Sequence, residues 1–307
     1  MGGASGGKAV PVLIVLVALV AIWYVGAVLL NAPVLLDGYA RNNIPFAWPQ
    51  FILDAWNQDR PVLPSPHQVA IDFWKSTVGL NVGSKKSLVY HSWVTLSATL
   101  LGFGTGTLLG IVLAVLIVHT DASDRSLMPW IIASQTIPIV ALAPVFVVVT
   151  YNVLTGDNIL ANTFHLTGDS ARLVSKALVS TYLSFFPVVV GMVKGFRSPE
   201  ALHLDLMHTY SASRIQTFWK LRWPIALPYL FTSMKVGVAA SLVGAIVGEL
   251  PTGAVAGLGA RLLGGSYYGQ TVQIWSALFA AAILAGLLVV AVGVVEKLVV
   301  RRMGARP

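Results

Sequence analysis

The chain has 307 residues, of which 56% are hydrophobic and only 10% are charged, and its formal net charge is +8. A soluble protein would carry about 25% charged residues, so these long apolar blocks indicate a polytopic membrane protein. The absence of cysteine excludes disulfides and thiolate metal sites. Because the basic residues are scattered among apolar runs, they favour a role in membrane topology over nucleic-acid binding.

Six apolar runs are long enough to be membrane helices, since a span needs roughly 20 apolar residues. They cover about Val10–Leu30, Trp93–Val118, Trp130–Val153, Ala177–Val193, Ala226–Leu250 and Val272–Val295. The first run is too long for a signal-peptide core, so we expect it to be retained as a helix. The sequence therefore predicts an all-α polytopic membrane protein with six transmembrane helices.

The lysines and arginines indicate an orientation. With a cytoplasmic N-terminus, the inner segments carry more basic residues than the outer ones, and most outer basic residues lie in one long loop, where charges count less. Both termini and residues 198–228 are then cytoplasmic. Lys176 falls in an outer segment, and Lys235 lies inside the fifth span.

Four regions follow from these spans. Residues 1–30 form an N-terminal transmembrane helix, 31–90 an outer loop, 91–302 a core of five transmembrane helices, and 303–307 a cytoplasmic tail. A second outer loop, Leu154–Arg172, is expected to be a solvated connection, with a lid as the alternative.

The first outer loop contains a helix signal. Leu63-Pro64-Ser65-Pro66 predicts a turn in which Ser65 is the N-cap and Pro66 the first residue of a short helix. Val69, Phe73 and Trp74 would share one side of this helix. We therefore expect it to lie on the outer membrane surface.

Small and polar residues inside the spans have two possible uses. Gly102, Gly106 and Gly110 are spaced four apart, as are Gly237, Ser241, Gly244 and Gly248, and such strips are typical of close helix packing. Polar residues near helix-breaking prolines suit either a water-accessible path or packing between helices. The candidate path residues are Gln135, Thr136, Pro138, Ser184 and Glu249.

Residues 198–228 form a polar, helix-forming insert between two apolar spans. Ser198-Pro199-Glu200 predicts a helix start, after which Leu202, Leu206 and Tyr210 fall on one face. A second helical stretch begins after Ser211, and prolines then lead into the fifth span. The two helices would either lie on the membrane surface or dock into a groove of a partner.

The insert resembles the cytoplasmic signature of permease subunits of binding-protein-dependent ABC importers. That signature is Glu-Ala-Ala, three residues, Gly, nine residues, then Ile-x-Leu-Pro. This chain has Asp205-Leu206-Met207, three residues, Ser211, nine residues, then Leu221-Arg222-Trp223-Pro224. The spacing is the same throughout, while only the proline is identical.

Three further strings resemble the nitrate, sulfonate and taurine branch of these permeases. They are Leu63–Pro66, Trp223–Tyr229, and Val247–Leu250 followed by Gly257-Leu258-Gly259. The resemblance extends from about Leu63 to Arg302. It implies a type I importer fold in a bacterial inner membrane, with a coupling segment at 198–224 between the fourth and fifth spans.

The resemblance also implies partners and site residues. Two permease copies or paralogues would form the path for a small solute, either a nitrate-like or sulfonate-like anion or a pyrimidine thiamine precursor, delivered by an extracytoplasmic binding protein. A separate ABC ATPase would bind ATP and dock on the coupling segment, so that no cofactor is expected on this chain. The coupling residues would be Glu200, Asp205, Leu206, Met207, Ser211, Arg214, Leu221 and Pro224.

The chain itself offers no enzyme chemistry. It contains no G-x-x-x-x-G-K-[ST] string, no metal-ligand cluster and no nucleophile–base pair, so it is not expected to be an enzyme. A secondary transporter driven by an ion gradient is the alternative. It would place ionisable residues near the membrane midplane, where only Glu249 and Lys235 come close.

Overall fold

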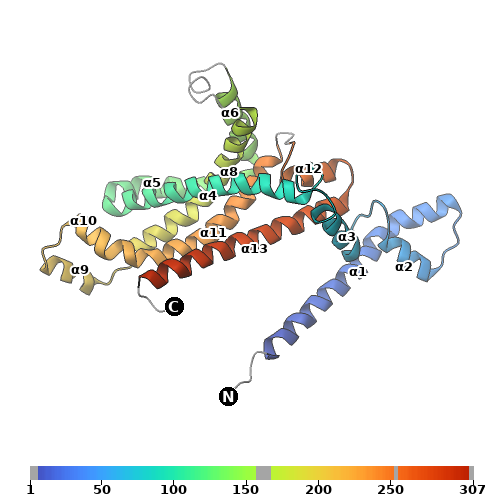
Figure 1. Cartoon of the computed structure of the whole chain (residues 1–307), viewed down its shortest axis with the longest axis horizontal. Coiled ribbons are helices and arrows are strands. Elements are labelled where there is room, and N and C mark those ends of the chain that lie inside the picture. Colours follow the sequence, from blue (N-terminus) through green and yellow to red (C-terminus); the bar gives the residue numbers. More distant parts are fainter. Residues whose placement is uncertain (1–5, 157–166, 252–254, 304–307) are drawn as a thin grey trace. The chain divides into compact units, whose positions relative to one another are not determined.

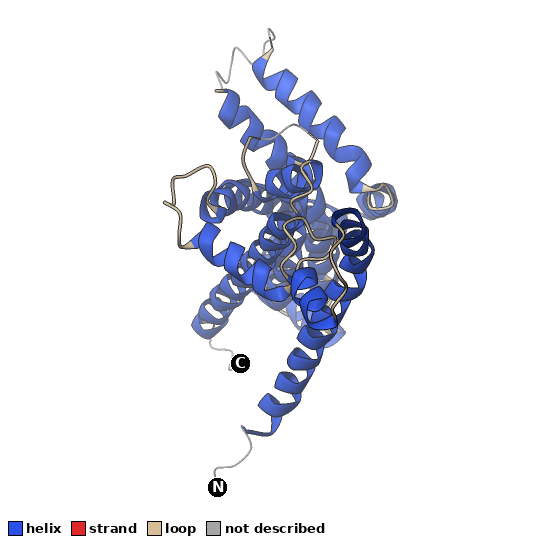
Figure 2. Cartoon of the chain, turned by 90° about the vertical axis from the view of Figure 1, so that its right-hand side faces the viewer, coloured by secondary structure: helices blue, strands red, loops and turns tan. Residues whose placement is uncertain are grey.

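A computed structural model describes residues 6–156, 167–251 and 255–303, with side chains from residue 10 onward. Every regular element in these ranges is a helix (Figures 1 and 2). In chain order they are α1 (Gly6–Asn42), α2 (Trp48–Trp56), α3 (Pro66–Thr77), α4 (Leu88–His119), α5 (Asp121–Ser134), α6 (Ile139–Thr155), α8 (Gly168–Phe196), α9 (Ala201–Thr209), α10 (Arg214–Thr217), the π-helix η1 (Phe218–Arg222), α11 (Trp223–Glu249), α12 (Leu258–Tyr267) and α13 (Thr271–Arg302).

Five helical stretches in the described residues are long and apolar enough to cross a membrane, and a sixth arises if the bent pair α5 and α6 is one span. The predicted all-α membrane fold is therefore confirmed. The third predicted span, Trp130–Val153, is not one straight helix, because α5 and α6 meet at an angle of 100°. The break lies at Gln135–Pro138, since proline has no N–H to donate and disfavours helical geometry in the residue before it.

Several helices extend beyond the predicted apolar spans. The first helix continues from Leu30 to Asn42, and α10, η1 and α11 together form one stretch from Arg214 to Glu249. Hydropathy marks only the part of a helix that can lie in lipid, whereas the backbone hydrogen bonds continue into its polar ends. Part of the predicted outer loop 154–172 lies outside the described residues.

The chain divides into two compact units. One comprises residues 1–90 and 261–280, and the other residues 91–260 and 281–307. The helices α4, α12 and α13 each contribute residues to both units.

In the second unit, α8 packs against the glycine strip of α4. A Cβ on Gly102 would lie 2.2 Å from Cβ of Ser180, and one on Gly106 would lie 2.0 Å from Oγ of Ser184. These separations are far shorter than any van der Waals contact, so only glycine allows the two backbones to approach this closely. The structure thus confirms the interpretation of this strip as a packing face.

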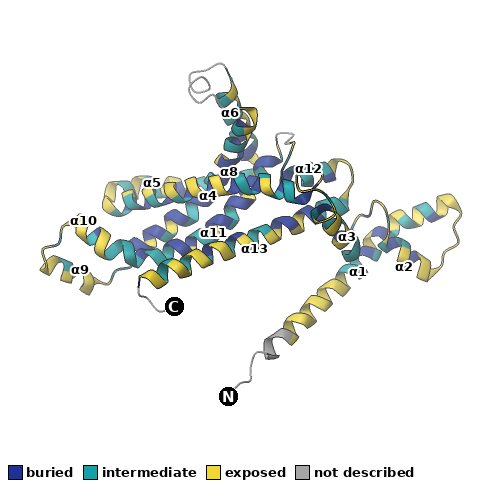
Figure 3. Cartoon of the chain, viewed as in Figure 1, coloured by how far each residue is buried: buried dark blue, intermediate teal, exposed yellow. Residues whose placement is uncertain are grey.

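The fifth span presents its own small-residue strip to the same helices. A Cβ on Gly244 would lie 2.7 Å from Cα of Ser180. Ser241, one turn earlier, donates a 2.9 Å hydrogen bond to the carbonyl of Thr99 in α4. The helices α4, α8 and α11 therefore pack against one another, and buried residues concentrate on these helices (Figure 3).

The first unit is organised around Asn31, a fully buried residue of α1. Its Nδ2 donates to the carbonyls of Ala55 and Leu63, both at 3.0 Å, and its Oδ1 accepts from the N–H groups of Val62 and Leu63. All four hydrogen-bonding positions of the amide are used, as a buried polar group requires. The loop before α3 is thereby fixed to α1.

The predicted start of α3 is confirmed. Ser65 is the N-cap and forms a capping box with Gln68, and Pro66 opens the helix. The predicted common face is divided, however, because Val69 is buried while Trp74 is 66% exposed. The five-residue separation turns Trp74 away from the side of α3 that packs against the unit. The position of α3 at a membrane surface stays a prediction.

Candidate functional site: a coupling segment and a buried carboxylate

The helix α9 lies exposed on the second unit. None of its residues is buried, and Leu202 is 74% exposed (Figure 3). Leu206 and Tyr210 follow at intervals of four residues and are also exposed. This spacing gives one narrow apolar stripe along α9 that no described part of the chain covers.

The start of α9 differs from the prediction. Glu200 is the N-cap, and the helix begins at Ala201 instead of in the Ser198-Pro199-Glu200 string. Ser198 does not cap, because its Oγ donates 2.8 Å to the carbonyl of Gly195 in the last turn of α8. The hydroxyl therefore closes the preceding helix.

The end of α9 explains the small residue at position 211. The backbone N–H of Ala212 donates to the carbonyl of Met207, and that of Ser211 donates to His208, both at 2.9 Å. These two bonds are the Schellman pattern, in which the residue after the C-cap is left-handed. Ser211 has φ +53, so it occupies the conformation in which glycine is normally found.

The second half of the segment is continuous with the fifth span. Ser213 and Gln216 form a capping box at the start of α10, where Arg214 is the first helical residue. Leu221 lies in η1, and Pro224 lies in the first turn of α11. The π-helix η1 ends two residues before Pro224, close to the position where the proline cannot donate a backbone hydrogen bond.

An aromatic cluster connects this segment to the helices of the second unit. Phe218 is buried, and its ring centroid lies 5.2 Å from those of Phe196 in α8 and His119 in α4. Trp223 contacts both phenylalanines at about 6 Å. The first residue of η1 therefore packs against both α8 and α4.

The predicted path residues occupy three separate places. Gln135, Thr136 and Pro138 form the break between α5 and α6, where Thr136 and Pro138 are exposed. Ser184 is buried and donates 3.2 Å to the carbonyl of Gly102 in the α4–α8 contact. Glu249 is buried at the end of α11. A common path along these residues stays a prediction.

Glu249 has a complete set of protein partners. Thr95 Oγ1 donates to Oε1 at 3.0 Å, the Gly259 N–H donates to Oε2 at 2.8 Å, and Lys176 Nζ lies 3.4 Å from Oε1. Glu249 is 0% exposed. A carboxylate with no access to water needs such donors and an opposite charge.

The segment before α12 is folded around this carboxylate. A Cβ on Gly257, which has φ +129, would lie 2.1 Å from Oε1 of Glu249. Gly257 donates its N–H to Nδ1 of His91, and Leu258 donates to Thr95 Oγ1. The Gly257-Leu258-Gly259 string and Glu249 are therefore one structural element.

Lys176, Thr95 and His91 were not among the predicted site residues. The distribution of charges predicts Lys176 in an outer segment, whereas it is buried in α8 and also donates a 3.1 Å hydrogen bond to the carbonyl of Ala256. The signal was present in part, because a buried carboxylate predicts a basic partner. Nothing in the sequence showed which lysine that was.

The sequence was compared with known families and proteins. The family model described as "Binding-protein-dependent transport system inner membrane component" matches residues 106–305. The formylaminopyrimidine transport permease protein ThiX of Halalkalibacterium halodurans is 31% identical over 198 residues, which are 64% of this chain and 68% of that protein. The riboflavin transport system permease protein RibX of Chloroflexus aurantiacus is 31% identical over 240 residues, which are 78% of this chain and 80% of that protein.

A solved structure shares the fold. The inward-facing MetNI methionine ABC transporter aligns with a TM-score of 0.54 and 19% identity, over 69% of this chain and 95% of the solved chain. The comparisons give no support to a secondary transporter driven by an ion gradient. With a family match over most of its length, the chain belongs to the binding-protein-dependent transport system inner membrane components, the transmembrane permeases of ABC importers.

Proposed function

We propose that this chain carries a small solute across the inner membrane as one of two permease subunits, driven by ATP hydrolysis on a separate ATPase that docks on α9. Both termini and α9 would lie in the cytoplasm. A binding protein on the other side would deliver the solute. This chain would bind no cofactor of its own, because ATP is bound by the partner.

The exposed stripe of α9 is the observation that carries the proposal. Leu202, Leu206 and Tyr210 have no cover in the described residues, yet a Schellman turn ends α9 and a capping box begins α10. An ordered helix with an uncovered apolar stripe is typical of a helix that fits into a partner's groove. The cluster around Phe218 would pass its movement to α4 and α8.

The composition of α9 argues against a helix that simply rests on lipid. Interfacial helices have a wide apolar face and usually basic residues opposite it. In α9 the stripe is narrow and flanked by His203, Asp205 and His208. The acidic Asp205 would be repelled by anionic lipid but suits a basic groove on a protein.

The substrate class follows from the relatives. The matched relatives include permeases named for formylaminopyrimidine and riboflavin, and others, 22–23% identical, named for nitrate and aliphatic sulfonates. We propose a small solute of one of these kinds, either a flat heterocycle or an oxyanion.

Co-purification of the ATPase tests the docking of α9. Tyr210→Ser and Tyr267→Ser form a matched pair, because the two tyrosines are 75% and 77% exposed but only Tyr210 lies beside α9. We expect Tyr210→Ser to weaken retention of the ATPase on the tagged permease about tenfold, as for an aromatic anchor. Tyr267→Ser should retain it fully. Equal retention by both variants would remove α9 as the docking surface.

A further inference from the structure

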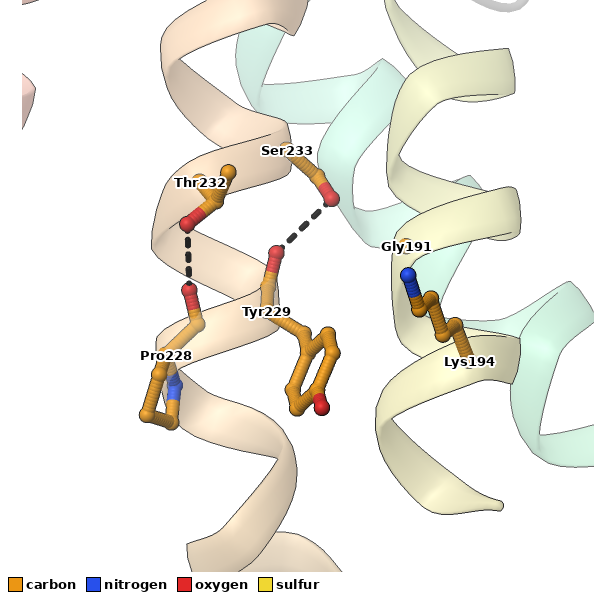
Figure 4. A pocket seen from close by; sticks show the side chains of 6 residues that line it. All are labelled: Gly191, Lys194, Pro228, Tyr229, Thr232 and Ser233. Carbon is orange, nitrogen blue, oxygen red and sulfur yellow. Dashed lines mark hydrogen bonds between the residues drawn. The ribbon is translucent and has the colours of Figure 1, made fainter. Parts of the chain in front are cut away.

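A cavity of about 350 Å³ lies between α8 and α11 (Figure 4). Its lining residues are Gly191, Lys194, Pro228, Tyr229, Thr232 and Ser233. This volume is at the small end of the range for small-molecule sites, about 300–1,000 Å³. The cavity is thus large enough for a compact solute and too small for a peptide.

The cavity is built by a change in the contact between the two helices. At Gly191 the helices are as close as they can be, since a Cβ there would lie 1.7 Å from Oγ of Ser233. Beyond this contact, Lys194 of α8 and Tyr229 of α11 extend into the same gap (Figure 4). The wall is thus held by tight packing, while its two longest polar side chains point into the opening.

The hydrogen bonds already made in the wall decide which groups remain to bind a solute. Thr232 Oγ1 donates to the carbonyl of Pro228 at 2.8 Å, and Ser233 Oγ donates to that of Tyr229 at 2.7 Å (Figure 4). Both hydroxyl protons are therefore already donated within α11. The donors left are the Lys194 ammonium and the Tyr229 hydroxyl, for which the described residues show no hydrogen-bond or ion-pair partner.

The lining of the cavity carries positive charge only. Lys194 is the single charged residue among the six lining residues, all of which are described, and no carboxylate accompanies it. The cavity is open on one side, since Lys194, Pro228 and Thr232 are exposed. A cation and a phenol that both donate favour an anionic oxygen group, because charge-assisted hydrogen bonds are the stronger ones.

The cavity lies at the α9 end of the second unit. Lys194 is in the last turn of α8, and α9 begins at Ala201. Tyr229 lies about two turns into α11. If α9 docks the ATPase, this is the end of the permease at which an imported solute is released.

We propose that this cavity is the release-side binding site of the permease and that it selects solutes carrying a carboxylate, sulfonate or phosphate group. This inference rests on the proposed import function. Of the two solute classes named above, the flat heterocycle and the oxyanion, it selects the oxyanion. The phosphate of an anionic lipid headgroup has the same chemistry, so the test separates the two sources.

Because the chain has no cysteine, a single introduced thiol is the only site on this chain that a thiol reagent can label. A Thr232→Cys variant of the assembled transporter, in nanodiscs of phosphatidylcholine, is reacted with the anionic sulfonatoethyl and the cationic trimethylammonioethyl methanethiosulfonates. Modification of this chain is followed by mass. The ratio of the anionic to the cationic rate should fall about fivefold to tenfold when Lys194→Met is added, for a loss of about 1 kcal/mol of charge interaction. Lys194→Arg should keep the ratio.

Protection identifies the occupant. Methanesulfonate, acetate or methyl phosphate should slow the labelling of Thr232→Cys when Lys194 is present and not in the Lys194→Met background. An unchanged rate ratio in Lys194→Met, or the absence of protection by all three anions, overturns the inference. Protection by phosphatidylglycerol in the nanodiscs, without protection by the three soluble anions, also overturns it by assigning the site to lipid.

The labelling result is separate from the test of import coupling. If neither tyrosine variant lost ATPase retention, α9 would be excluded as the docking surface. The labelling ratio would be unaffected by that result. Labelling that does not depend on Lys194 would remove the oxyanion site and leave the ATPase docking intact.

Discussion

The backbone N–H of Gly259, in the first turn of α12, donates a 2.8 Å hydrogen bond to the carboxylate of Glu249, the last residue of α11. Thr95 of α4 donates to the same carboxylate, and Lys176 of α8 forms its ion pair. One buried side chain thus connects three membrane helices and the segment before α12. A solute can reach Glu249 only if these contacts open.

Glu249→Gln removes the charge that Lys176 needs. The lysine is then a buried ammonium without an anion, a change that typically costs about 3–5 kcal/mol. We expect a clear fall in the thermal unfolding temperature of the purified permease. The double variant Lys176→Met with Glu249→Gln removes both charges and should recover most of the loss. Equal instability of the single and double variants would contradict an ion pair as the source of the effect.

Gly257→Ala should be destabilising, because Gly257 has φ +129 and its Cβ would overlap the Glu249 carboxylate at 2.1 Å. Strain of this kind costs about 1–3 kcal/mol. Gly264→Ala is the control, since a Cβ at Gly264 has no atom within 4 Å and the residue lies in α12. Gly257→Ala should unfold at a lower temperature than Gly264→Ala. Equal unfolding temperatures would argue against the tight fold of the segment before α12.

Gly106→Ala tests the contact between α4 and α8. The added Cβ would lie 2.0 Å from Oγ of Ser184, whereas a Cβ on the neighbouring Gly104 has no atom within 4 Å. We expect Gly106→Ala to lower stability by about 1–3 kcal/mol through overpacking. Gly104→Ala, measured by the same thermal unfolding, should be close to the wild type. The reverse order of the two variants would contradict the packing of α8 on this strip.

Ser211→Gly should stabilise the coupling segment. Ser211 has φ +53, a conformation that costs roughly 1 kcal/mol for a residue with a Cβ and little for glycine. Hydrogen exchange of the Ala212 amide, which bonds to the Met207 carbonyl, should slow about fivefold in Ser211→Gly and quicken in Ser211→Val. If the Ala212 amide exchanged at the same rate in the wild type, Ser211→Gly and Ser211→Val, the Schellman turn would not determine the stability of the end of α9.

The sequence predicted most of the membrane helices because their apolar runs are long and need no partner to be recognised. The capping signal at Ser65 and Pro66 was also sufficient, since a cap depends only on its own first turn. The break at Gln135–Pro138 was visible as a proline. The 100° angle was not, because it depends on what α5 and α6 pack against.

The sequence did not reveal which residues pair with the charged residues inside the helices. Its polarity predicts Lys176 in an outer segment, whereas in α8 it pairs with a carboxylate 73 residues away. Lys235 likewise pairs with Glu296 of α13 at 2.5 Å. Hydropathy treats each charge as a cost and contains no information about which distant residue neutralises it.

Cross-linking tests the docking of the ATPase on α9 most directly. The chain has no cysteine, so Leu206→Cys places one thiol on the apolar stripe, and Leu108→Cys, an exposed leucine of α4, is the control. In membranes that contain the assembled transporter, a short thiol-to-amine cross-linker should join position 206 to the ATPase and position 108 to no ATPase. Efficient ATPase retention with no cross-link from position 206, or an equal yield from both positions, would contradict the docking of α9.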